Sequence, residues 1–166
     1  MRIPYRQPGK YSQTQFDPVL TKEKEAEIKR QLDRLKNTSR PRAAAEVARL
    51  AELGDFSENV EYQLAKGRLR GINNRILILE NQLRQAVIIT PQSSTNIVRL
   101  GHTVTIECGG NKRIYQILGS AETNPKQGII SHNSPIGAAI IGRKVGETVR
   151  VKLAKKEVEC KILKIE

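Results

Sequence analysis

A long heptad pattern constrains the fold of this chain more than any other feature. Between residues 62 and 86, apolar side chains recur at alternating spacings of three and four, which is typical of a coiled-coil seam. The residues in the pattern are Tyr62, Ala65, Leu69, Ile72, Ile76, Leu79, Leu83 and Ala86. At a rise of about 1.5 Å per residue, a helix over residues 57–86 forms a rod of roughly 45 Å.

A second helical region precedes this rod. Thr21 is the predicted N-cap, and apolar residues follow it at helical spacing. Pro41 interrupts the pattern, so we expect a kink or a restart there, with Ser39 as the new N-cap. The helix then continues to about Leu53, and only residues 54–57 separate it from the rod. So short a connection predicts an antiparallel hairpin formed within one chain.

After residue 86 the apolar period shortens to two, which is typical of strands. The predicted strands cover residues 102–108, 113–118, 148–153 and 157–165. A short helix is expected after Ser134, which is placed to cap it. The sequence therefore predicts an α+β protein, with an antiparallel coiled coil over residues 20–88 and a β-rich domain over residues 89–166.

The remaining residues give weaker signals. Residues 1–19 contain three prolines and no hydrophobic period, so we expect a mobile basic tail. Cys108 and Cys160 have no CxxC or Cys/His spacing, and we interpret them as buried small side chains rather than metal ligands or a redox motif. His102 and His132 lack a second ligand nearby, which favours surface or packing roles.

The charge of the chain points to polyanionic partners. Lys and Arg number 29 against 17 Asp and Glu, a net charge of +12, which favours nucleic acid or a machine that holds it. Aromatic residues make up only 4%, so a base-stacking platform would lack its side chains. There is no apolar run of membrane-spanning length and no signal peptide, and we expect a cytoplasmic protein.

The turn of the predicted hairpin has the opposite charge. Residues 50–65 contain no Lys or Arg but four acids, Glu52, Asp55, Glu58 and Glu61. Asp55 and Glu58 are three apart and can share a cation, and Mg²⁺ is commonly held by only one or two protein carboxylates. The alternative is structural, because Asp55-Phe56-Ser57-Glu58 also fits a capping box in which Asp55 caps the helix. Both interpretations remain open at this point.

The same turn carries a specific motif. Residues 54–62, GDFSENVEY, resemble the tip of the bacterial Gre transcript-cleavage factors, the GreA/GreB family. Residues 20–35, Arg40-Pro41 and residues 134–147 agree with the family in order and spacing, so that the resemblance covers about residues 20–166. It implies an N-terminal antiparallel coiled coil and a C-terminal domain of the FK506-binding-protein type. This is the organisation derived above from periodicity.

The resemblance also implies a function. The coiled coil would enter the secondary channel of bacterial RNA polymerase, where Asp55 and Glu58 would help to hold a catalytic Mg²⁺ ion during cleavage of backtracked RNA. Phe56, Ser57 and Asn59 would position the tip. The ion would be shared with the polymerase, so the chain would be an accessory factor rather than an enzyme. Its partners would be the polymerase and the nascent RNA 3′ end, with DNA as a further candidate.

Two more surfaces follow from the resemblance. A basic patch is expected to contact RNA, with a solvated helix face as the alternative; its members are Lys66, Arg68, Arg70 and Arg75. A docking segment is expected to contact the polymerase, with the core of the domain as the alternative; its members are Ser134, Pro135, Ile136 and Gly137.

Two functional alternatives accompany these expectations. A Gre-like inhibitor that occupies the channel without promoting cleavage is the second functional hypothesis. Prolyl isomerase activity is disfavoured, because Tyr115 is the only aromatic residue from residue 87 onward and a proline site needs an aromatic-lined pocket. We expect a monomer, since the seam is satisfied within the hairpin.

Overall fold

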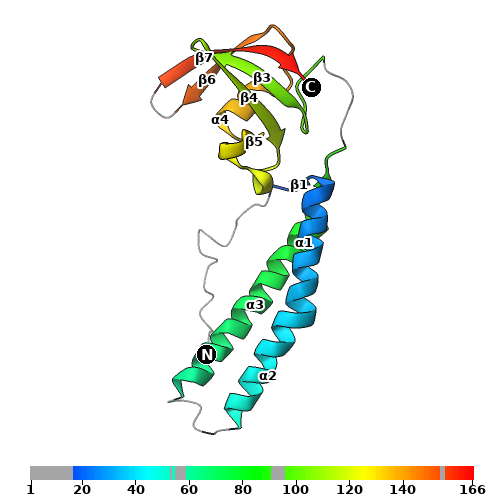
Figure 1. The fold of residues 1–166 in the computed structure, drawn as a ribbon, viewed down its shortest axis with the longest axis vertical. Helices are drawn as coiled ribbons and strands as arrows, with labels where there is room; N and C mark the ends of the chain where they lie inside the picture. The colour runs from blue at the N-terminus through cyan, green and yellow to red at the C-terminus, as the bar shows by residue number, and fades with distance from the viewer. Residues whose placement is uncertain (1–16, 53, 55–58, 91–95, 154–155) are drawn as a thin grey trace, which may run out of the picture.

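The structure is a computed structural model, and it describes residues 17–52, 54, 59–90, 96–153 and 156–166. A long helical hairpin forms the N-terminal part, and a curled β-sheet domain with one short helix forms the C-terminal part (Figure 1). The predicted α+β class, a helical hairpin followed by a β-rich domain, is confirmed.

The hairpin has one helical arm on each side. The first arm consists of α1 (Lys22–Arg34), a π-helical turn (Leu35–Ser39) and α2 (Arg40–Ala51). The second arm is α3 (Val60–Gln85), which runs antiparallel to the first (Figure 1). Thr21 caps α1 as predicted, because its hydroxyl accepts a hydrogen bond from the N–H of Lys24.

The α-helix is interrupted before Pro41 as predicted, and Pro41 lies in the first turn of α2, but the predicted cap by the Ser39 side chain does not form. Ser39 has helical backbone angles and makes no side-chain cap, so the first arm continues through this region. Pro41 has no N–H to donate to the helix. In the π-helical turn before it, the N–H of Arg40 donates a hydrogen bond to the carbonyl of Leu35, five residues earlier. Lys36 in this turn pairs with Glu80 of α3, and that hydrogen bond lowers the pKa of the Glu80 carboxyl.

The heptad seam lies between the two arms, as predicted. Ala65, Ile76 and Leu79 are buried, and the other five seam residues are half-buried. At the base of the hairpin, Leu79 joins Ile28 and Leu20 in a small apolar core. A two-helix hairpin covers its seam from one side only, which is why many positions remain half-buried.

The C-terminal domain is built on a five-stranded sheet in the order β5-β4-β3-β7-β6. The strands are β3 (Thr103–Cys108), β4 (Asn111–Leu118), β5 (Ile129–Ser131), β6 (Thr148–Leu153) and β7 (Lys156–Ile165). Only β4 and β5 are parallel; the other neighbouring pairs are antiparallel. Helix α4 (Pro135–Ile140) packs inside the curl of the sheet (Figure 1). The four strands predicted from alternation are all present, and β5 is an addition.

The interpretation of the cysteines as unbonded side chains is wrong. Cys108 and Cys160 lie opposite each other on β3 and β7 and form a disulfide. Their 52-residue separation conceals the pairing, because neither strand alone reveals its neighbour or its register. Cys160 is buried in the core of the domain, and Cys108 packs against that core.

A small junction joins the two parts. Val19–Leu20, just before α1, forms β1, which pairs in parallel with β2 (Val87–Ile88), just after α3, at the base of the hairpin. Residues 17–19, which were predicted to belong to the tail, take part in this junction. Val19 passes so close to Gly119 that a Cβ there would lie 2.0 Å from the Val19 carbonyl oxygen. Only glycine fits this approach without a shift of the backbone.

Candidate functional site

The far end of the hairpin is the first candidate site. Helix α2 ends at Ala51, and Gly54 adopts a φ of 75° in the left-handed region that favours glycine. Helix α3 begins at Val60, and Asn59 caps it by accepting a hydrogen bond of 3.0 Å from the N–H of Tyr62. The connection between the two helices thus runs from residue 52 to residue 59.

The four central tip residues, Asp55, Phe56, Ser57 and Glu58, lie outside the described residues. The start of α3 nevertheless corrects one expectation about them. The N-cap of α3 is Asn59, so Asp55 is not the residue that caps this helix. Asn59, one of the residues expected to position the tip, is this N-cap.

Two further acids flank the tip. Glu52 lies at the end of α2 and Glu61 in the first turn of α3, and both are exposed. Within the described part of the hairpin, neither carboxylate has a Lys, Arg or His partner within 4 Å. The acidic character read from the sequence therefore extends to the surface on both sides of the tip.

The predicted basic patch is divided between two sides of α3. At about 100° per residue, Lys66 and Arg70 lie on one flank of the seam, and Arg68 and Arg75 lie on the other. Lys66 stacks over the ring of Tyr62 at 5.5 Å, while Arg68 reaches across to Glu46 of α2 at 3.4 Å. The four residues are exposed, but they do not form a single surface.

The outer face of α3 separates these two basic flanks. Val60 and Leu64 are 69% and 56% exposed there, and Gly67 and Gly71 continue the same line toward the base. A Cβ at either glycine would meet nothing within 4 Å. This face of the hairpin is uncharged and lies away from the seam.

The predicted docking segment is partly internal. Ser134 caps α4 by accepting a hydrogen bond from the N–H of Gly137, and Gly137 is buried so closely that a Cβ would lie 2.1 Å from the Ser131 carbonyl oxygen. Pro135 is exposed and Ile136 is half-buried. Of the four residues, only these last two present apolar side chains for contact with another molecule.

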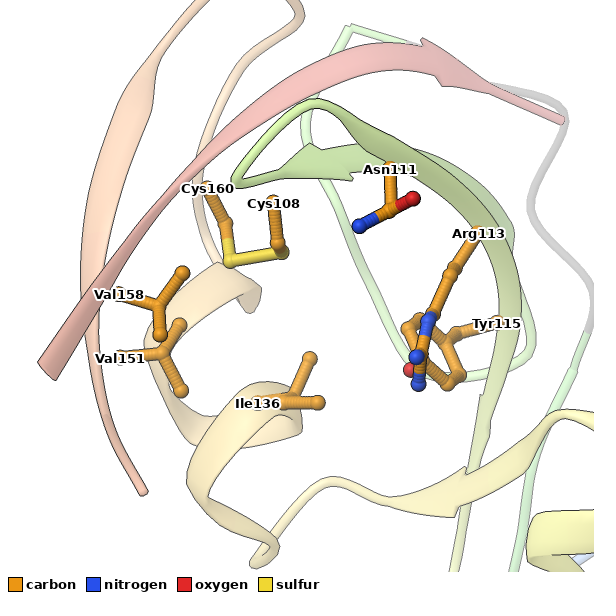
Figure 2. Close-up of a pocket in the computed structure, with 8 residues that line it drawn as sticks. All are labelled: Cys108, Asn111, Arg113, Tyr115, Ile136, Val151, Val158 and Cys160. Atoms are coloured by element: carbon orange, nitrogen blue, oxygen red, sulfur yellow. A yellow bond between two sulfur atoms is a disulfide. The ribbon is translucent and has the colours of Figure 1, made fainter. Parts of the chain in front are cut away.

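Ile136 lines the cavity of about 200 Å³ on the inner face of the sheet (Figure 2). Its other lining residues are Cys108, Asn111, Arg113, Tyr115, Val151, Val158 and Cys160. Tyr115 is the single aromatic side chain among them.

The junction contains a polar cluster that sequence patterns did not indicate. Asp17 accepts hydrogen bonds from the backbone N–H of Ser120 at 2.7 Å and from its hydroxyl at 2.8 Å. In the opposite direction, Glu122 accepts from the backbone N–H and the hydroxyl of Thr21, each at 2.7 Å. Each part of the molecule thus supplies one carboxylate to the other.

Asp17 is held in its charged form at this junction. Burial acts to raise the pKa of its carboxyl, but the hydrogen bonds from Ser120 and Val19 and the nearby His132 outweigh it, so that the pKa lies below its ordinary value of 3.8. His132 is half-buried beside this carboxylate, with its Nδ1 3.5 Å from the Asp17 Oδ2. A local sequence pattern could not reveal this cluster, because its members are about 100 residues apart.

Comparison with known proteins agrees with both halves of this architecture. A family model described as "Transcription elongation factor, GreA/GreB, C-term" matches residues 92–166, and one described as "Transcription elongation factor, N-terminal" matches residues 18–88. The chain belongs to the GreA/GreB family of transcription elongation factors. The two matched regions of this Gre-family chain correspond to the helical hairpin and the β-sheet domain.

Individual relatives cover nearly the whole chain. Transcription elongation factor GreA of Chloroflexus aggregans is 39% identical over 92% of this chain and 99% of its own length. Its counterpart in Bacillus subtilis is 38% identical over 88% of this chain and 94% of its own length. Among solved structures, GreA factor homolog 1 (Gfh1) of Thermus thermophilus is 28% identical with a TM-score of 0.40, covering 89% of this chain and 97% of that one.

Across the part of the chain that the structure describes, none of the helices combines the length and the apolar character needed to cross a membrane.

Proposed function

We propose that this Gre-family factor inserts its helical hairpin into the secondary channel of RNA polymerase and stimulates the polymerase's own cleavage of backtracked RNA. Asp55 and Glu58 would help to hold a catalytic Mg²⁺ ion that is shared with the polymerase. The chain would act as an accessory factor and not as a complete enzyme. The proposal extends the family's role in transcription elongation to a specific mechanism.

One observation carries the proposal: the acidic end of the hairpin. A chain with a net charge of +12 places four acids and no Lys or Arg in the sixteen residues around its turn. Asn59 caps α3, so the start of that helix does not require Asp55, and Glu61 is the one acid of the four that lies in its first turn. Acids that no structural role explains are available to a ligand, and a carboxylate pair favours a cation.

The residues present suit Mg²⁺. This ion prefers oxygen ligands and usually takes one or two protein carboxylates, with phosphates and water completing its shell. Asp55 and Glu58 supply two carboxylates, and no third ligand is needed from this chain. When bound, the ion would activate water and stabilise the charge that develops on the scissile phosphate.

The rest of the hairpin would position these acids. The antiparallel arms form a rod whose buried seam limits bending, and Asn59 fixes the point at which α3 begins. The two basic flanks, Lys66 with Arg70 and Arg68 with Arg75, would attract RNA or the acidic wall of a channel. The polymerase would provide the remaining metal ligands and the substrate.

The C-terminal domain would dock on the polymerase outside the channel. Pro135 and Ile136 are the members of the docking segment with accessible apolar surface. A bacterial polymerase works in the cytoplasm, so this factor would act there as a soluble protein. The nascent RNA 3′ end would be its nucleic-acid partner, and DNA contact would be secondary.

RNA cleavage in a stalled, backtracked elongation complex tests this proposal. Wild-type protein is expected to accelerate cleavage, whereas an Asp55→Asn, Glu58→Gln double variant that still binds polymerase should lose at least about 100-fold of that stimulation. A Glu23→Gln, Glu27→Gln variant is the matched control, because it removes two exposed carboxylates from α1, away from the tip. If wild-type protein blocks synthesis without cleavage, the chain is a channel-occupying inhibitor and the proposal fails.

A further inference from the structure

The two cysteines face each other across neighbouring strands of the C-terminal sheet. The antiparallel register of β3 and β7 pairs Cys108 directly with Cys160, and their Cα atoms are 4.2 Å apart. The backbone ladder therefore holds the two sulfur atoms together whether or not they are bonded. The chain has no other cysteine. Within a single molecule, this pair can react only with each other or with an external thiol or oxidant.

The two residues differ in access to solvent. Cys160 is only 2% exposed, whereas Cys108 is half-buried at the end of its strand. Both residues line the cavity of the inner face, where Figure 2 shows the disulfide on the wall. A small reagent that enters this cavity meets the sulfur of Cys108. Arg113 is the one charged residue of the lining, and a cation favours the thiolate, the form that reacts.

We propose that Cys108 and Cys160 form a reversible thiol–disulfide modification site. A peroxide or a small disulfide would close the bond, and a dithiol or glutathione would open it. Cys108 would be the residue that reacts first, and Cys160 would resolve the intermediate. The bond state would set the stability of the C-terminal domain and the shape of the cavity beside Ile136.

The oxidation balances with hydrogen peroxide as the oxidant. The Cys108 thiolate attacks one peroxide oxygen, the O–O bond breaks, and Cys108 becomes a sulfenic acid while the other oxygen leaves as water. The Cys160 sulfur then attacks the Cys108 sulfur and displaces the hydroxyl, which leaves as a second water. The pair loses two electrons and two protons in total. Reduction by a dithiol reverses this through a mixed disulfide.

The bond state has a physical consequence in the fold. The disulfide closes a 52-residue separation, and a cross-link of this length stabilises a domain chiefly by restricting its unfolded chain. When the bond opens, the two sulfurs must separate to van der Waals distance. The cavity wall changes at that point, opposite the half-buried side chain of Ile136.

The inference that the site is regulatory rests on the proposed function. A factor that acts beside bacterial RNA polymerase works where thiols are kept reduced. Disulfides in such a compartment are usually transient and serve catalysis or redox sensing. The chemistry of the site, by contrast, depends only on the two cysteines and can be tested without polymerase.

Thiol alkylation with mass spectrometry tests the chemistry in the full-length protein. After equilibration in glutathione buffers from strongly reducing to oxidising, wild type is expected to pass from two alkylated thiols to none. On treatment with hydrogen peroxide, the Cys160→Ser variant should form a sulfenic acid at Cys108 that dimedone traps. The Cys108→Ser variant should resist oxidation at Cys160 and give little dimedone adduct. A bond that stays closed at the reducing end, or never closes at the oxidising end, would overturn the proposal.

Thermal unfolding of the same samples tests the consequence. Reduction is expected to lower the Tm of the C-terminal domain by about 10 °C in wild type and to leave the Cys108→Ser, Cys160→Ser variant unchanged. An equal Tm for both forms of wild type would contradict the inference. The alkylation and unfolding experiments do not involve polymerase. A separate result, failure of the chain to bind polymerase, would refute the proposed function and leave the thiol–disulfide chemistry unaffected.

Discussion

Carboxylates occupy both ends of the hairpin, but the two ends use them differently. At the base, Asp17 and Glu122 each accept two hydrogen bonds across the junction between the hairpin and the β-sheet domain. Near the tip, Glu52 and Glu61 are exposed, with no Lys, Arg or His partner among the described residues. The base acids hold two parts of the molecule together, whereas the acids near the tip face solvent.

Apolar side chains follow the same division. Leu20 and Leu79 are 0% and 1% exposed at the base, while Val60 and Leu64 are largely exposed near the tip. On α3, Leu79 belongs to the base core, whereas Val60 and Leu64 lie on the outer face of the helix and the neighbouring Ala65 is buried in the seam. The comparison shows that the base carboxylates join two parts of the molecule, and under the proposed function the acids near the tip would face the polymerase. Four comparisons break or sharpen this contrast.

The largest difference is expected between two leucines of α3. Leu79→Ala should reduce the free energy of unfolding by about 2–5 kcal/mol, because it empties part of the base core. Leu64→Ala, its matched control, should change stability by no more than about 0.5 kcal/mol, since that side chain is 56% exposed. Urea unfolding followed by circular dichroism measures both, and equal losses would remove the distinction between the ends.

A carboxylate at each end gives the second comparison. Glu122→Ala should cost about 1–3 kcal/mol of stability, because it leaves the half-buried N–H and hydroxyl of Thr21 without their acceptor. Glu61→Ala should cost at most about 0.5 kcal/mol, the lower part of the range for an acid at a helix start. Chemical denaturation of the two variants in parallel measures their free energies of unfolding relative to wild type. A more harmful change at Glu61 would show that the tip acids have a structural role.

The fold could be predicted in large part because its signals are local. The heptad of α3 and the alternation of β3 each lie within one continuous segment, and both are confirmed by the structure. The cap at Thr21 and the helix after Ser134 follow from neighbouring residues in the same way. Periodicity and capping are sufficient where a segment of sequence determines its own conformation.

The features that could not be predicted depend on distant residues. The disulfide requires β3 and β7 to be neighbours in one register, and the junction carboxylates meet partners about 100 residues away. The start of α3 at Val60 is a subtler case, because Asp55 and Asn59 are both suitable N-caps and local chemistry does not choose between them. The functional roles of Asp55 and Glu58 stay predictions, since these residues lie outside the described structure.

The glycines of α3 provide a third variant, with a gain in stability. Gly67→Ala and Gly71→Ala should each stabilise the hairpin by up to about 1 kcal/mol, because alanine favours the helix and its Cβ meets nothing at either position. Thermal unfolding measures the gain. If the outer face of α3 closely approaches the polymerase, the doubly substituted protein should also bind it more weakly. A loss of stability would contradict the open space at these positions.

The smallest effect is expected from pH at the base. Because folding lowers the pKa of Asp17, its contribution to stability is fully present above the unfolded value of about 3.9 and is lost as the pH falls through the lower folded value. The Asp17→Asn variant should therefore show a flatter decline in stability below about pH 4 than wild type does. The free energy of unfolding of both proteins is measured from neutral pH to below about pH 4. An equal decline in the two proteins would exclude Asp17 as a source of the acid sensitivity.

The Mg²⁺ dependence of RNA cleavage tests the central claim most directly. In a backtracked complex, saturating wild-type protein should lower the Mg²⁺ concentration for half-maximal cleavage by about tenfold or more, because two added carboxylates strengthen binding of the shared ion. The Asp55→Asn, Glu58→Gln variant, at a concentration that occupies the polymerase equally, should leave that concentration at its value without factor. The same shift with both proteins would show that the tip carboxylates do not hold the metal.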